Sequence, residues 1–132
     1  NLPAFPLPIY YFTAVKYILI TAPLITMSAQ PSPEMKRLND LLTKDILWIY
    51  ILSILKKHGK THAYVMRERI NAQFGFKPGQ VTAYVVLYKL QSRGYVSVIS
   101  EDKKKIYTIT KEGKALLAAA EAFFEEKLEM LF

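Results

Sequence analysis

The chain contains no cysteine and few acidic residues for its length. Without cysteine, disulfide bridges and thiolate metal sites are excluded. Eleven Asp and Glu residues stand against 18 Lys and Arg residues, which gives a formal net charge of +7 in 132 residues. A basic excess of this size is typical of proteins with an anionic partner, such as nucleic acid or a membrane surface. The length suits one domain with an appendage, because two well-packed cores need a longer chain.

Sequence signatures of catalysis and of metal binding are also lacking. There is no glycine-rich phosphate loop and no nucleophile elbow. Five of the eleven carboxylates fall in residues 111–132, where Glu121, Glu125 and Glu129 form one solvated row at i, i+4 spacing. His58 and His62 are four residues apart, but Gly59 interrupts a helix between them and no third ligand is near. We therefore expect neither an enzyme nor a bound metal or cofactor.

Proline and charge are unevenly distributed. Residues 1–34 hold six of the seven prolines and only two charged residues. Residues 35–110 hold fourteen basic and five acidic residues, and residues 111–132 hold three basic and five acidic residues. The first segment is long and apolar enough to resemble a membrane span, but Lys16 and Pro23 interrupt it. We expect an apolar arm that packs on the domain or on a partner subunit. The alternative is a membrane-tethered or protein-interaction module in which this arm is the working part.

From residue 35 onward the hydrophobic pattern has a helical period. Residues 35–42 predict a short amphipathic helix. Residues 44–59 predict a second helix that is apolar nearly all round and should be buried on more than one side. Thr43 and Asp45 suit its start, and Gly59 suits its end.

A third helix is predicted over residues 62–75, with Thr61 as its cap and Gly75 at its end. Trp48 and Tyr50 of the preceding helix are expected in the core rather than in an effector pocket. The core face expected for the third helix consists of Tyr64, Val65, Ile70 and Phe74.

A further helix and a β-hairpin follow. Residues 80–94 predict a helix with Ala83, Val86, Leu87 and Leu90 inward, which leaves Gln80, Thr82, Tyr84 and Lys89 facing outward. The period then changes to two in residues 95–100 and 105–110, which predict a hairpin with Lys103, Lys104 and Lys105 at its tip. Lysines in such a place can form charge-assisted contacts with phosphate.

Residues 111–132 predict a long final helix with one apolar stripe. A winged domain of this size covers only the start of such a helix, so the remainder needs a second chain. The sequence thus predicts a homodimer, with an interface formed by Leu117, Ala120, Phe124, Leu128 and Leu131.

The order of elements predicts an α+β, mostly α fold. It is a winged helix-turn-helix over residues 35–110, with an apolar N-terminal arm over residues 1–34 and a C-terminal dimerisation helix over residues 111–132. A helix of this motif fits the major groove of B-DNA, where its side chains reach base edges, and the wing can lie along the backbone.

Four stretches of the chain resemble the PadR family of transcriptional regulators. These are "THAY", "FGFKPG", "TAYVVLYKLQSRGYV" and "KKKIYTITKEGKALL", so the resemblance runs from about residue 45 to residue 117. The last stretch is the most specific, with its basic wing, aromatic strand, Thr, Gly and paired Leu. Two positions depart from the family pattern, because Ala63 and Val81 stand where the family usually has glycine.

The resemblance implies a cytoplasmic, sequence-specific regulator that binds double-stranded DNA as a homodimer and represses transcription. Relatives place small-molecule effectors near the dimer interface, but the residues here do not specify one. The candidate DNA contacts are Lys60, Thr61, His62, Lys77, Gln80, Thr82, Tyr84, Lys89, Lys103, Lys104 and Lys105.

Overall fold

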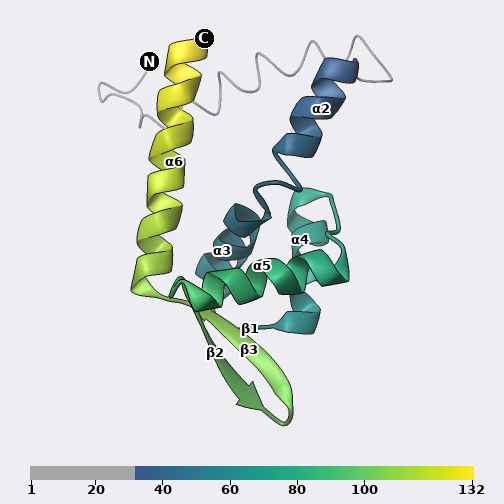
Figure 1. The fold of residues 1–132 in the computed structure, drawn as a ribbon, viewed down its shortest axis with the longest axis vertical. Coiled ribbons are helices and arrows are strands. Elements are labelled where there is room, and N and C mark those ends of the chain that lie inside the picture. The colour runs from purple at the N-terminus through teal and green to yellow at the C-terminus, as the bar shows by residue number, and fades with distance from the viewer. Residues whose placement is uncertain (1–31) are drawn as a thin grey trace, which may run out of the picture. The chain divides into compact units, whose positions relative to one another are not determined.

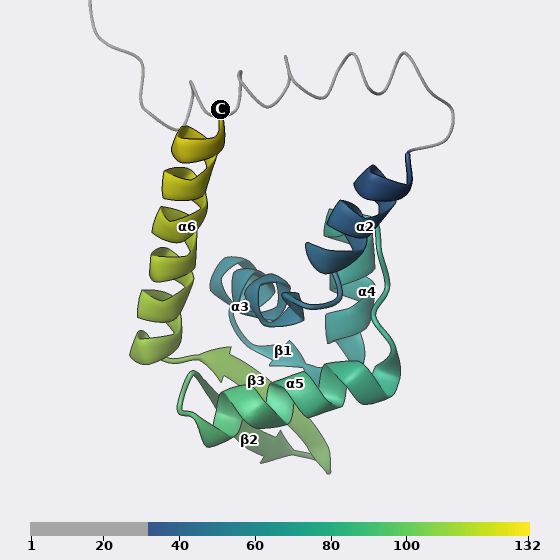
Figure 2. The same ribbon diagram turned by 45° about the horizontal axis from the view of Figure 1, so that its top comes forward.

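The computed structural model describes residues 32–132, which form helices and one three-stranded sheet (Figures 1 and 2). The elements run in the order α2 (Pro33–Leu41), α3 (Leu47–His58), β1 (Thr61–His62), α4 (Ala63–Phe74), α5 (Gln80–Ser92), β2 (Val96–Glu101), β3 (Lys104–Ile109) and α6 (Lys111–Leu131). Nearly all of the apolar arm expected over residues 1–34 lies outside the described residues. Within residues 32–132, no helix is long and apolar enough to cross a membrane.

Helix α2 begins just after Ser32. The backbone N–H of Met35 donates to Oγ of Ser32 at 3.2 Å, which satisfies one of the free donors at the start of the helix. None of the α2 residues is buried. The short helix expected over residues 35–42 is therefore present, and it begins two residues earlier.

Helix α3 is the centre of the domain formed by residues 40–132. It packs against α4, α5, α6 and β3, which explains why its sequence is apolar nearly all round. Fully burying one such side chain stabilises the fold by about 1.5–3 kcal/mol. Five α3 side chains are at most 1% exposed, namely Leu47, Ile51, Leu52, Ile54 and Leu55.

Trp48 and Tyr50 pack at the edge of this core, as expected. The Tyr50 ring meets Phe74 and Phe76 edge-on, with ring centroids 4.9 Å apart in both pairs. Lys57 lies over the Phe74 ring, with its Nζ 5.7 Å from the ring centroid. Burial of this cluster raises the pKa of Tyr50 above its ordinary value.

The start of α3 differs from the prediction. The helix begins at Leu47, and residues 42–46 form turns. The Thr43 hydroxyl donates back to the carbonyl of Asp40 at 3.2 Å, so it does not cap α3. Ile46 precedes the first helical residue and makes no side-chain capping bond. A threonine hydroxyl that donates to a nearby backbone carbonyl stabilises a turn instead of capping a helix, and Thr43 does so here.

The sheet has three strands rather than the two of a simple hairpin. Its order is β1-β3-β2, and all pairings are antiparallel. In β1, Thr61 lies opposite Tyr107 of β3 and His62 lies opposite Ile106. A strand of two residues carries no alternation that a sequence pattern could reveal.

Thr61 therefore has a different role from the helix cap that was expected. Its side chain is 1% exposed, its Oγ1 donates to the carbonyl of Gly59 at 3.1 Å, and it accepts a bond from Arg69 Nη1 at 2.8 Å. His62 stands at the N-cap of α4 and makes no side-chain capping bond. Thr61 thus joins the end of α3 to the middle of α4.

The core face of α4 also differs from the prediction. Of the four residues expected there, Ile70 is buried, Val65 and Phe74 are half-buried, and Tyr64 is 59% exposed, whereas Ala63 and Met66 are buried instead. Ala63 and Met66 already fill the inward positions of the first turn, so Tyr64 faces outward.

Helix α6 is joined to the wing through Thr110. The Thr110 Oγ1 accepts a bond from the backbone N–H of Gly113 at 3.1 Å and donates to the carbonyl of Gly94 at 2.7 Å. The two bonds connect the first turn of α6 to Gly94, two residues before β2. Leu116 and Leu117 then pack against the core, and α6 extends away from the sheet (Figure 1).

Candidate DNA-binding surface

The turn between α4 and α5 is held by bonds from α4. Gly75 ends α4 in the left-handed conformation that glycine adopts without strain. The Arg67 Nε then donates to the carbonyl of Pro78 at 2.7 Å. Lys77 forms an ion pair and hydrogen bond with Glu68. These contacts fix the start of α5 relative to α4, which is the geometry of a helix-turn-helix.

Lys77 is therefore already paired in this structure. The hydrogen bond and the charge of its ammonium group hold the pKa of the Glu68 carboxyl below its ordinary value. Both side chains are well exposed, so Lys77 can exchange the carboxylate for a phosphate at modest cost.

The four residues expected to face outward on α5 are exposed, but they do not share one face. Gln80 and Tyr84 lie on one flank of the helix, and Thr82 and Lys89 lie on the opposite flank. Between the flanks, directly opposite the buried residues, run Val81, Val85 and Tyr88. The sequence prediction named these three residues neither among the inward positions nor among the outward ones.

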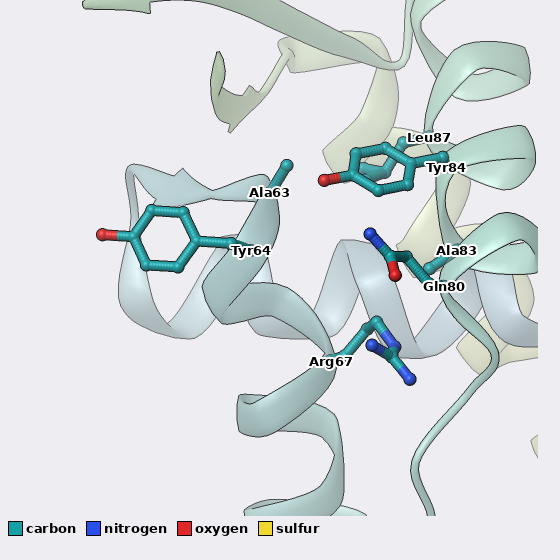
Figure 3. Close-up of a pocket in the computed structure, with 7 residues that line it drawn as sticks. All are labelled: Ala63, Tyr64, Arg67, Gln80, Ala83, Tyr84 and Leu87. Carbon is teal, nitrogen blue, oxygen red and sulfur yellow. The ribbon is translucent and has the colours of Figure 1, made fainter. Parts of the chain in front are cut away.

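A pocket of about 100 Å³ opens between α4 and α5. Its floor is apolar, and Figure 3 shows the side chains of Arg67, Gln80 and Tyr84 extending into the space between the two helices. The Tyr64 ring points away from it (Figure 3). The lining residues are Ala63, Tyr64, Arg67, Gln80, Ala83, Tyr84 and Leu87.

The wing is a tight hairpin whose two-residue turn is Asp102-Lys103. Both residues have positive φ, 49° and 64°, as the type I′ hairpin turn requires. Only Lys103 of the three lysines lies in the turn itself. Lys104 and Lys105 belong to β3, where they lie opposite Glu101 and Ser100 of β2. Consecutive strand residues point to opposite faces, so Lys104 and Lys105 diverge.

Tyr64 links the wing to the start of α4. The Lys104 Nζ lies 5.3 Å from the centroid of the Tyr64 ring, within the range of a cation–π contact. The His62 ring centroid lies 5.3 Å from the same ring. The exposed Tyr64 thus holds one wing lysine beside the helix-turn-helix, a role that sequence reasoning missed because it assigned this tyrosine to the core.

Tyr107 connects the wing to α5. It is 3% exposed, and its burial, with a smaller effect of the neighbouring Tyr84, raises its pKa above the ordinary value. Strand β2 of the wing also contacts α5. In the part of the chain that the structure describes, no cluster of three His, Asp or Glu side chains could hold a metal ion.

Residues 51–119, more than half of the chain, match the Transcriptional regulator PadR-like family. The chain belongs to this family. It is a winged-helix DNA-binding transcriptional regulator of the PadR type, and the family consists of regulators rather than enzymes. No curated protein sequence matches the chain significantly.

Solved structures share the fold of this PadR-like protein at low identity. A transcriptional regulator from Clostridium thermocellum is similar with a TM-score of 0.61 at 19% identity, covering 77% of this chain and 95% of that one. A PadR family transcription regulator from Clostridium difficile has a TM-score of 0.58 at 21% identity, and the match covers 64% of this chain and 93% of that one. A PadR-like transcription factor from Bacteroides fragilis has a TM-score of 0.59 at 19% identity, and the match covers 72% of this chain and 95% of that one.

The PadR-like fold brings most of the candidate contacts to the region of α4, α5 and the wing. Lys60, Lys77, Gln80, Thr82, Tyr84, Lys89 and residues 103–105 are exposed, and His62 is half-buried. Thr61 is the exception, because its hydroxyl is buried against Gly59 and Arg69 and cannot reach DNA directly.

The candidate dimer residues on α6 differ in exposure. Leu117 packs partly against the core of its own domain, Ala120, Phe124 and Leu128 are half-buried, and Leu131 is 73% exposed. Phe123, Met130 and Phe132 are also exposed, between 55% and 70%.

Proposed function

We propose that this PadR-like regulator represses transcription as a two-fold homodimer that binds operator DNA. In this proposal residues 35–110 bind DNA, with α5 in the major groove and the wing on the phosphate backbone, and residues 111–132 form the dimer. The observation that carries it is the exposed face of α5 beside a basic wing whose Lys104 is held against α4 by Tyr64.

The distribution of charge supports this orientation. Between Lys60 and Lys105 the chain carries nine basic and three acidic residues, whereas residues 111–132 carry three basic and five acidic ones. Phosphates attract the first segment and repel the second. The basic residues proposed to contact phosphates are Lys60, Lys77, Lys89 and the three wing lysines. Gln80, Thr82 and Tyr84 flank the α5 surface that meets the bases, and His62 lies beside the wing.

Binding to duplex DNA should depend steeply on salt. If a dimer neutralises roughly 6–10 phosphates, affinity falls by about 10³–10⁵ between 50 and 200 mM salt. Replacing Lys103, Lys104 and Lys105 by alanine should weaken binding to every sequence and flatten this slope, as measured by fluorescence anisotropy. The matched control removes the same charge from α6, by alanine at Lys111, Lys114 and Lys127, and should leave the slope nearly unchanged. Equal slopes for the wing variant and the wild type would refute the role of the wing.

The proposed dimer interface on α6 is tested by placing a charged residue among its apolar side chains. The chain supplies exposed apolar side chains along α6 that a monomer leaves in water, and a second copy related by two-fold symmetry can cover them. Such a dimer presents two copies of α5 to successive major grooves, about 34–36 Å apart, and reads an inverted repeat.

Phe124→Asp should therefore yield a monomer that binds the operator much more weakly. Ala122→Asp is the matched control, because it adds the same charge to the exposed opposite face of α6. Sedimentation of Phe124→Asp as a dimer with wild-type affinity would show that α6 is not the interface.

A further inference from the structure

Three exposed apolar side chains form a stripe along α5. Val81 is 76% exposed, Val85 is 45% exposed and Tyr88 is 69% exposed. Their i, i+4, i+7 spacing places them on one face of the helix, opposite the buried Ala83 and Leu90. Single exposed apolar residues are ordinary on a protein surface, but a row of three on the helix that enters the DNA groove needs a partner. We refer to these three residues as the α5 stripe.

The polar inventory of α5 limits what the helix can read. Residues 80–92 contain no arginine, asparagine or carboxylate, and Lys89 is their only charged residue. Arginine and lysine are the usual readers of guanine, carboxylates accept from cytosine, and asparagine or glutamine pair with adenine. Gln80, at the N-terminal end of α5, is thus the residue best suited to read a purine edge, and it favours adenine.

Thymine is the base whose major-groove edge carries an apolar group. Its C5-methyl is recognised by apolar side chains such as the methyl groups of Ala and Thr or the ring of Phe. The α5 stripe presents two valines and a tyrosine to that groove, between the flank of Gln80 and Tyr84 and the flank of Thr82 and Lys89.

We propose that Val81, Val85 and Tyr88 recognise thymine C5-methyl groups, so that the operator half-site has A·T pairs where α5 enters the major groove. This inference rests on the proposed binding of duplex DNA. DNA is favoured over a protein as the occupant because nine basic and only three acidic residues lie between Lys60 and Lys105, around the stripe.

The test begins with sites selected by the full-length protein from a random duplex pool. In a selected site each thymine is replaced, one at a time, by deoxyuridine, which removes the C5-methyl and keeps every hydrogen bond of the base pair. Replacement of a contacted thymine should raise Kd about fourfold, the factor that corresponds to about 0.8 kcal/mol for one buried methyl-sized group at 25 °C. Thymines outside the footprint serve as the control and should show no change.

The matched protein variants are Val81→Ser and Val85→Ser. Serine carries no methyl group, and both positions are exposed, so the fold is retained. Each variant should lose the preference for thymine over deoxyuridine at one position of each half-site and keep it at the others. Ile99→Ser, at a β2 residue that is 45% exposed like Val85, should leave all of these preferences intact.

Two outcomes overturn the inference. One is tight, selective binding that no deoxyuridine replacement weakens, and the other is an unchanged thymine preference in both valine variants. Failure of the protein to bind any duplex in a salt-dependent manner is a different result, because it overturns the proposed function itself.

Discussion

Gly113 in the first turn of α6 provides the sharpest test of the packing. A Cβ built at this position would lie 2.1 Å from the carbonyl oxygen of Tyr95 and 2.8 Å from Cγ1 of Ile109. The first of these atoms belongs to the backbone and cannot rotate away. Gly113→Ala therefore requires α6 and the start of β2 to separate by roughly 1 Å before the contact becomes ordinary, which overpacks the site.

Two opposing effects decide the sign of the change. Alanine has the higher helix propensity, and in a helix interior it stabilises by up to about 1 kcal/mol relative to glycine. Overpacking costs about 1–3 kcal/mol. Separation also weakens the bonds that Thr110 makes to Gly94, Tyr95 and Gly113, each of which contributes about 1 kcal/mol. We expect a net destabilisation of about 2–4 kcal/mol.

Urea unfolding followed by far-UV circular dichroism, at one fixed protein concentration, measures the effect. Gly79→Ala is the matched control, because a Cβ there meets only Thr82 Oγ1 at 3.6 Å, an ordinary contact. Alanine is a poorer N-cap residue than glycine, which destabilises the helix start, but it also lowers the conformational entropy of the unfolded chain, which stabilises the fold. The two effects nearly cancel, so we expect the free energy of unfolding to change by no more than about 0.5 kcal/mol. If Gly113→Ala proves as stable as the wild type, the close approach of α6 to Tyr95 is wrong.

Two further predictions concern the wing. Lys103 has φ of 64°, a conformation that costs a side-chain-bearing residue about 1 kcal/mol and glycine nothing, so Lys103→Gly should raise the free energy of unfolding by about that amount while weakening DNA binding. An unchanged urea midpoint would contradict it. Burial raises the pKa of Tyr107 in the folded state. The buried, neutral hydroxyl therefore contributes its full stabilisation below the unfolded-state pKa of ~10, and this stabilisation is lost as pH rises through the folded-state pKa. Stability should fall less steeply above that pH in Tyr107→Phe, and identical alkaline profiles would argue against burial of this hydroxyl.

Much of the fold could be predicted from local patterns. The inward positions of α5, the hairpin of β2 and β3 and the long helix after Thr110 all follow from the hydrophobic period. The family resemblance rests on the same stretches, and the family match confirms it. These features are local because a helix or a hairpin places residues only a few positions apart on one face.

Tertiary packing decided the rest. Thr61 was predicted as a cap and a DNA contact, but β3 pairs with it and Arg69 bonds its hydroxyl, so it is buried. Tyr64 was predicted in the core, but Ala63 and Met66 occupy the inward positions and Tyr64 meets Lys104 of the wing instead. The contacts of Thr61 with Arg69 and Tyr107, and of Tyr64 with Lys104, join residues at least eight positions apart in the chain, which a periodic pattern does not encode.

The DNA-binding surface shows the same division. Sequence alone determined that the chain is basic between residues 60 and 105 and that α5 follows the turn of a helix-turn-helix. The inward residues of α5 imply which side of the helix faces outward, but only the packed structure decided how far each outward residue is left uncovered. Val81, Val85 and Tyr88 lie exposed at the centre of that side, between the two flanks of polar residues first selected. The physical reason is that burial depends on neighbouring elements, so the exposure of each residue is known only once those elements are in place.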